Sequence, residues 1–191
     1  IEGDEGIIVI DPLTSLETGA AALALYQKHR GSNRDVKAVI YTHSHVDHFG
    51  GVKGFVSEKD VEEKDVKIIA PEGFLEHAVS ENVYTGTSMS RRAAYMYGAA
   101  LEQGPRGQIG AGLGQTTSTG TVTLIAPNMI IKRTGEKRTI DGINMEFQMA
   151  PDTEAPSEML IWFPDLNALC AAEDATHTFH NILTLRGAVV R

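Results

Sequence analysis

The chain has 191 residues, of which 42% are hydrophobic and 22% are charged, a balance typical of a soluble globular domain with its own core. A net charge of −8 argues against a nucleic-acid partner. No apolar run approaches the ~20 residues of a membrane helix, and the single cysteine, Cys170, excludes an intrachain disulfide framework.

The first part of the chain predicts a parallel pair of buried strands. Apolar runs over 6–12 and 36–41 are typical of such strands, and residues 16–29 between them have helical spacing that ends at Gly31. This order predicts a right-handed crossover. Asp11 comes where the first strand ends, and either accepts a hydrogen bond that orients a metal ligand or forms an ordinary Asp-Pro turn.

Four potential metal ligands follow the second strand within six residues: His43, His45, Asp47 and His48. Open α/β sheets place ligand sites at this edge, and imidazole and carboxylate bind Zn²⁺ and similar ions. His43 and His45 alternate, so they can share one metal, while Asp47 and His48 lie past the bend and can face a second. Gly50 and Gly51 let the backbone turn tightly afterwards and start the next helix without a Cβ clash.

A hydroxide held between two metals would be a strong nucleophile at neutral pH, because the cations lower the pKa of water. The alternative is an exposed loop that is His-rich without function.

The middle of the chain continues the α/β pattern. It predicts a short helix over 52–55, a solvated charged segment over 58–65, a strand over 66–71 and a helix over 72–79. His77, in the last of these, is either structural or a metal ligand.

Residues 82–120 differ in composition from the rest. Their first part predicts a helix with an aromatic and Met face, including Tyr84, Met89 and Tyr95. This face is either core or a lid or channel for an apolar substrate tail. The Gly-rich stretch 104–114 has no Walker pattern, so phosphate binding is not expected there.

The second half predicts antiparallel strands. Strand-like runs cover 121–126 and 130–131, and two hairpins are predicted over 137–150, around Asp141-Gly142, and over 159–172. Cys170 alternates into the interior of the last strand.

Two carboxylates stand at the ends of these strands. Glu154 and Glu173 each follow an apolar run, and acidic groups at such positions are seldom buried without a cation. Glu158 is interpreted as a surface residue or as one that supports a ligand.

These motifs together resemble a known family. The H-x-H-x-D-H pattern of 43–48 resembles the metallo-β-lactamase superfamily. The chain also looks like the alkyl sulfatases of that superfamily, which are related to enzymes that cleave dodecyl sulfate. Four segments carry this second resemblance: G-L-G-Q-T-T-S-T-G (112–120), T-E-A-P-S-E (153–158), C-A-A-E (170–173) and residues 177–188. The wider superfamily usually has a histidine in the place of Glu154. The resemblance implies an α/β fold, an αββα sandwich that is incomplete in this chain.

The resemblance also implies a ligand set with two Zn²⁺ per chain. His43, His45 and Glu154 would hold the first zinc, Asp47 and His48 the second, and Glu173 would bridge them. The family's remaining ligand, a downstream histidine, has no counterpart here. His177 and His180 are candidates from spacing alone, or packing residues.

Asn181 and Arg186 match positions that hold the sulfate group, a role that suits the planar fork of arginine. Mn²⁺ or Fe²⁺ would also accept the His and carboxylate ligands.

The expected function is hydrolysis of alkyl sulfate esters to alcohol and inorganic sulfate by a metal-bound water or hydroxide poised by Asp47 and Glu173. The alternatives are another hydrolase of this fold, acting on a lactam, thioester or phosphoester, or a metal-binding fragment without activity. Residues 1–191 would be part of the catalytic domain, without the family's downstream dimerisation and sterol-carrier-like domains. The resemblance further implies a homodimer in the full-length protein, and a periplasmic or secreted location.

Overall fold

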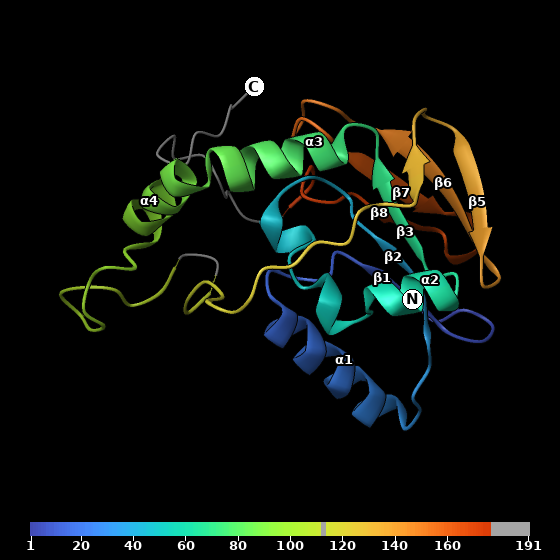
Figure 1. The fold of residues 1–191 in the computed structure, drawn as a ribbon, viewed down its shortest axis with the longest axis horizontal. Helices are drawn as coiled ribbons and strands as arrows, with labels where there is room; N and C mark the ends of the chain where they lie inside the picture. Colours follow the sequence, from blue (N-terminus) through green and yellow to red (C-terminus); the bar gives the residue numbers. More distant parts are fainter. Residues whose placement is uncertain (112–113, 177–191) are drawn as a thin grey trace.

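Two four-stranded sheets pack face to face in the computed structural model, which describes residues 1–111 and 114–176 (Figure 1). The first sheet is parallel in the order β1-β2-β3-β4. Its strands are β1 (Ile7–Ile10), β2 (Val36–Ile40), β3 (Lys67–Pro71) and β4 (Met129–Ile131). The parallel pairing of β1 with β2 confirms the parallel pair predicted from the sequence.

The second sheet is antiparallel throughout, in the order β5-β6-β7-β8. Its strands are β5 (Glu136–Ile140), β6 (Ile143–Met149), β7 (Met159–Phe163) and β8 (Ala168–Cys170). The turn between β5 and β6 has positive φ at both Asp141 (48°) and Gly142 (77°). This is the conformation a two-residue hairpin requires. The antiparallel pairings of β5 with β6 and of β7 with β8 confirm both predicted hairpins.

Helices and short turns connect the strands of the first sheet. They are α1 (Leu16–Arg30), the 3₁₀ turns Val46–His48 and Val52–Gly54, α2 (Glu58–Glu63), α3 (Phe74–Val79), a π-helical turn (Ser80–Tyr84) and α4 (Gly86–Tyr97). Ser15 caps α1 through the Thr18 N–H, and Gly31, in the left-handed conformation, ends it. None of the helices in these described ranges is long and apolar enough to span a membrane.

Alternation along the parallel strands divides the core into two layers. Ile7 and Val39 face the helices, and Leu23 and Phe74 pack against them there. Ile8 and Ile40 lie on the opposite face, in a cluster with residues of the second sheet such as Phe147. Strands buried on both faces read as continuous apolar runs, which explains the sequence pattern.

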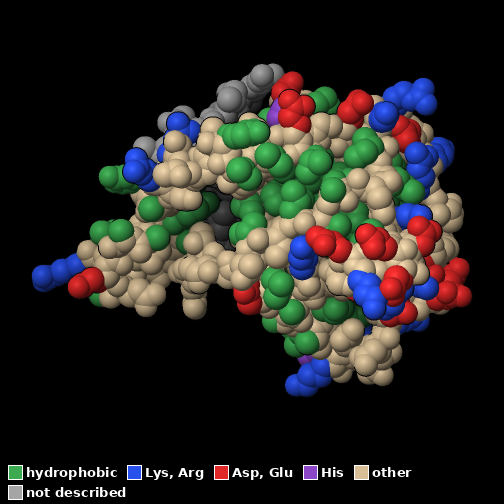
Figure 2. Space-filling model, in the orientation of Figure 1, with side chains coloured by type: hydrophobic (Ala, Val, Ile, Leu, Met, Phe, Trp, Pro, Cys, Tyr) green, Lys and Arg blue, Asp and Glu red, His purple; other side chains and the backbone are tan. Residues whose placement is uncertain are grey.

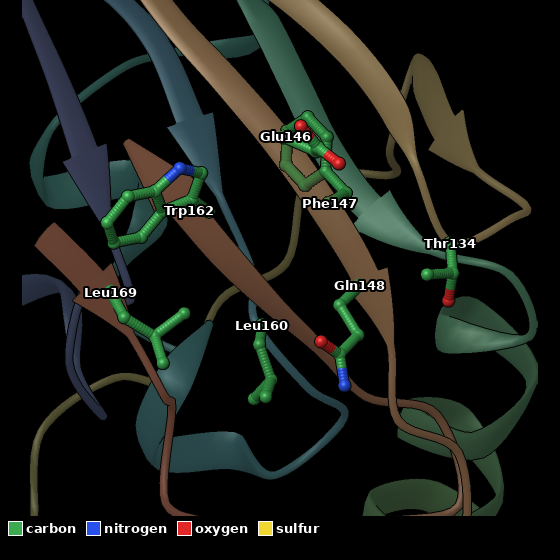
Figure 3. Close-up of a pocket in the computed structure, with 7 residues that line it drawn as sticks. All are labelled: Thr134, Glu146, Phe147, Gln148, Leu160, Trp162 and Leu169. Atoms are coloured by element: carbon green, nitrogen blue, oxygen red, sulfur yellow. The ribbon is translucent and has the colours of Figure 1, made fainter. Parts of the chain in front are cut away.

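The described residues therefore form a helical layer and both sheets of the αββα sandwich that the sequence predicts. The outer face of the second sheet carries Leu160, Trp162 and Leu169, with Glu146 and Gln148 beside them (Figure 3). These five residues line a shallow pocket together with Thr134 and Phe147. Leu169 is 57% exposed.

One predicted strand needs correction. Residues 121–126 form no strand, because their polar groups bond to other elements: the Thr123 N–H donates to the Gly50 carbonyl (2.7 Å) and the Thr121 N–H to Glu17 (2.7 Å). The prediction of a solvated segment over 58–65 is confirmed, and its first six residues form α2, since Ser57 and Asp60 form a capping box.

The core interpretation of the aromatic helix is also wrong. Tyr84 and Tyr95 are each 83% exposed, and no residue of α4 is buried.

Candidate metal centre

The His43–His48 loop lies where the two sheets meet. The Tyr41 N–H still donates to Ile69 of β3, whereas the next residues bond to the second sheet: the Met159 N–H donates to the Thr42 carbonyl (2.9 Å), and His43 forms a β-bridge with Glu158. The loop is thus fixed from both sides at the carboxyl end of β2, the edge where open sheets bind ligands.

Gly50 and Gly51 follow the 3₁₀ turn in a crowded place. A Cβ atom on Gly50 would collide with the Thr14 carbonyl, and one on Gly51 with the Pro12 carbonyl. Neither glycine has a positive φ. The expected need to avoid a Cβ clash is therefore confirmed, and it comes from close backbone packing rather than from a left-handed conformation.

Two groups of candidate ligands share one carboxylate. His43, His45 and Glu173 bring ligand atoms within 4.8 Å of one another, and so do Asp47, His48 and Glu173. Glu173 Oε2 lies 3.9 Å from His43 Nε2 and 3.6 Å from His48 Nε2. This is the arrangement needed for a carboxylate between two cations.

Glu154 reaches the same place from the loop after β6. Its Oε1 lies 3.5 Å from His45 Nδ1, and Glu154 and His45 are both largely shielded from solvent. The structure thus brings together all six residues predicted as metal ligands.

A buried imidazole supports the fit to a metal. His43 is fully buried, its Nδ1 is held 2.9 Å from Thr42 Oγ1, and its Nε2 has no hydrogen-bond partner among the described residues. A neutral imidazole nitrogen in such a place is a suitable metal donor. Burial first, and then the nearby charges of His48 and His45, lower the pKa of His43 to about 2, so this ring stays neutral.

Asp11 fixes His48 at the other end of the site. Its carboxylate accepts hydrogen bonds from Thr42 N (2.8 Å), Thr42 Oγ1 (2.7 Å) and His48 Nδ1 (2.9 Å). His48 Nε2 then faces Asp47 Oδ2 at 3.6 Å. The geometry supports the first of the two interpretations of Asp11, a residue that orients a ligand.

The charge on His48 follows from these contacts. Burial lowers the pKa of His48, but hydrogen bonds with Asp11, Asp47 and Glu173 outweigh it and raise the pKa to about 12. In the absence of metal, His48 is therefore an imidazolium among carboxylates.

Glu158 is fully buried, so the surface interpretation of this residue is wrong. Its Oε2 accepts hydrogen bonds from Thr153 Oγ1 (3.1 Å) and the Ala155 N–H (2.9 Å), the two neighbours of Glu154. Burial raises the pKa of Glu158 to about 7. Glu158 thus supports the loop that carries Glu154.

Sequence reasoning missed Glu81, whose Oε2 lies 4.0 Å from His45 Nε2. It belongs to the π-helical turn, and no local pattern in the sequence predicts such a turn. His77 is in neither ligand group of the described residues, and its ring lies beside Gly73 at the start of α3. Asn181, Arg186, His177 and His180 lie outside the described residues.

Comparison with known proteins gives consistent matches over the whole chain. Residues 1–169 match the family model of the metallo-beta-lactamase superfamily. A linear primary-alkylsulfatase of Pseudomonas sp. is 61% identical over 191 residues, and the alkyl/aryl-sulfatase BDS1 of Saccharomyces cerevisiae is 51% identical over the same length. This chain spans 28% and 29%, respectively, of those two proteins.

Solved structures of an alkylsulfatase and of a metallo-beta-lactamase also match this chain. The stereoselective inverting sec-alkylsulfatase Pisa1 of Pseudomonas sp. is 48% identical, with a TM-score of 0.91 over 100% of this chain and 30% of its own. A metallo-beta-lactamase from Pontibacter korlensis, 15% identical with a TM-score of 0.51 over 88% of this chain and 55% of its own, supports the fold alone.

Proposed function

Because this chain belongs to the metallo-β-lactamase superfamily, and because it resembles alkylsulfatases over its whole length, we propose that its protein hydrolyses alkyl sulfate esters at a site for two metal ions. The observation that carries the proposal is the position of Glu173, whose carboxylate lies within reach of both ligand groups. The presence of Glu154 beside His45, where the wider superfamily usually has a histidine, supports the sulfatase branch.

The ligand assignment follows the two groups. His43, His45 and Glu154 would hold the first ion, Asp47 and His48 the second, and Glu173 would serve both. Zinc suits this set of imidazoles and carboxylates. When bound, the two cations lower the pKa of water and so supply a nucleophile near neutral pH.

The chain's own residues orient the reaction. Asp47 is the most solvent-accessible carboxylate of the site, at 44% exposure of its side chain, so it can accept the proton of an incoming water. Glu173 fixes the water's position from the buried side. The overall reaction converts the sulfate ester and water into an alcohol and hydrogen sulfate.

Substrate binding extends to both sides of this centre. We propose that Asn181 and Arg186 bind the sulfate oxygens, since a guanidinium pairs well with an oxyanion. The alkyl chain would lie against the arm formed by α3, the π-helical turn and α4 (74–97). Tyr84 and Tyr95 are exposed on this arm, and hydrophobic side chains are visible along it in Figure 2. The ligand of this arm is thus a long apolar tail.

This chain spans less than a third of the length of these two relatives, which supports the proposal that it is part of a longer protein. Residues 1–191 would form part of the catalytic domain of a longer, homodimeric protein, periplasmic or secreted, with dimerisation and sterol-carrier-like domains downstream. Mass measurement of the natural protein in solution and cell fractionation would test these points.

The first experiment measures metal content and sulfate release from dodecyl sulfate on the whole protein, beside Glu173→Gln. Glu62→Gln, an exposed residue of α2 outside this arm, is a control with the same chemical change. Two zinc ions per chain, with sulfate release that only Glu173→Gln abolishes, would support the proposal. Two ions without release from any alkyl sulfate, but with turnover of a lactam, thioester or phosphoester, would overturn the substrate. A wild type without metal would overturn the mechanism.

A further inference from the structure

The connection between α3 and α4 is an interrupted helix that faces the metal centre. Residues Ser80–Tyr84 form a π-helical turn between the two helices. Such turns are rare and are frequent at functional sites. Here the turn places the carboxylate of its second residue, Glu81, beside His45.

Side-chain hydrogen bonds brace this turn on both sides of Glu81. Thr85 Oγ1 donates to the Glu81 carbonyl (2.9 Å), and Asn82 Nδ2 donates to the Ala78 carbonyl (2.9 Å). The Thr85 N–H also closes the turn on the Ser80 carbonyl (3.1 Å). The position of Glu81 is therefore defined by the fold rather than by a mobile loop.

The imidazole of His45 lies between two carboxylates, one at each ring nitrogen. Glu154 Oε1 is 3.5 Å from Nδ1, and Glu81 Oε2 is 4.0 Å from Nε2. Nδ1 is the buried nitrogen that faces the other proposed ligand. This leaves Nε2, on the side of the arm, to carry the proton.

We propose that Glu81 is a positioning residue that accepts the Nε2–H of His45 and so keeps Nδ1 directed at the first metal ion. This inference rests on the metal site of the proposed function. Metal-binding histidines commonly donate their second N–H to a carboxylate, which fixes the tautomer and the ring orientation. A side-chain adjustment of about 1 Å brings the two atoms to hydrogen-bond distance.

This contact also joins the metal centre to the substrate side of the site. Glu81 lies in the same arm as the exposed Tyr84 and Tyr95. A movement of the arm would change the hydrogen bond to His45 and with it the geometry at the first ion.

The test is a stepwise metal titration of the whole protein, with Co²⁺ followed by absorption and Zn²⁺ by competition with a chelator. Four proteins are compared: the wild type, Glu81→Ala, Glu81→Gln and the control Glu62→Gln, an exposed residue of α2. We expect Glu81→Ala to weaken the first site about 10- to 100-fold, with a changed Co²⁺ spectrum and an unchanged second site. Glu81→Gln, whose amide oxygen still accepts a hydrogen bond, should fall between Ala and the wild type.

The outcomes separate this inference from the proposed function. A wild type that binds two ions, with a Glu81→Ala variant that binds both as tightly, would overturn the role of Glu81 alone. Equal weakening of both sites together with a lower Tm would also overturn it, since that pattern indicates a role in folding. A wild type that binds no metal would overturn the proposed function and this inference with it.

Discussion

Replacing Asp11 by Asn tests whether this largely shielded carboxylate orders the metal loop. Asp11 Oδ1 accepts the Thr42 N–H, and Oδ2 accepts hydrogen bonds from Thr42 Oγ1 and His48 Nδ1. An asparagine has one acceptor oxygen and one NH₂ group. If the asparagine oxygen accepts the Thr42 N–H, the NH₂ group faces the His48 Nδ1–H. If the oxygen instead accepts the His48 Nδ1–H, the NH₂ group faces the Thr42 N–H. Either way, one donor meets another donor.

The hydrogen bonds lost in the variant set the expected loss of stability. The variant loses at least one charge-assisted hydrogen bond, worth about 1.5–3 kcal/mol, and leaves a donor unsatisfied at about 1–3 kcal/mol. Asp11 has 17% of its side chain exposed, so water compensates only part of this. We expect the free energy of unfolding of the metal-free protein to fall by about 2–4 kcal/mol. Zinc affinity at the His48 site should fall about 10- to 100-fold.

Urea unfolding without metal and a chelator competition with zinc measure the two effects. The control is Asp35→Asn, an exposed aspartate whose ion pair with Lys64 spans 3.9 Å. It should change stability by less than about 0.5 kcal/mol. If Asp11→Asn matched this control in both assays, the argument that Asp11 orients His48 would fail.

Three further predictions use other residues of the site. Burial raises the pKa of Glu158 to about 7 from an ordinary 4.5, so between these two pH values the native state retains a proton that the unfolded state loses. The free energy of unfolding of the metal-free protein, measured with urea, should therefore fall by up to about 3 kcal/mol as the pH rises through this range. Glu158→Gln should remove most of this pH dependence. Because the pKa of His48 is raised to about 12, zinc binding at pH 7 should release at least one proton per chain, measured with an indicator dye, and His48→Asn should release fewer. Tyr95→Ser should raise KM for long-chain more than for short-chain alkyl sulfates, with an unchanged Tm because Tyr95 is 83% exposed; an equal effect on both chain lengths would contradict the proposed alkyl site.

The sequence was sufficient for those features that depend on local order. An apolar run that ends in alternating histidines predicts both the buried strand β2 and the side of the loop on which His43 and His45 lie. The Asp141-Gly142 dipeptide predicts its hairpin because few other residues adopt two positive φ values in succession. The period of the pattern and the chemistry of the turn decide such elements without help from distant residues.

Features that depend on distant contacts were not predictable in this way. Residues 121–126 have the composition of a strand, but their hydrogen bonds go to Gly50 and Glu17. Glu158 has the sequence context of a surface residue, and only the β-bridge to His43 shows why it is buried. Glu81 belongs to a turn whose type depends on the packing of two helices.

The two sheets contribute different parts of the centre, and their packing therefore sets its geometry. The first sheet supplies the histidine loop and Asp11, whereas Glu154 and Glu173 follow strands of the second sheet. The Met159 N–H to Thr42 carbonyl bond and the His43–Glu158 bridge join these parts within a few residues of the ligands. A substitution in the core between the sheets, such as Phe147→Ala, should therefore disturb metal binding from a distance, because it loosens the contact that holds Glu154 and Glu173 opposite the histidines.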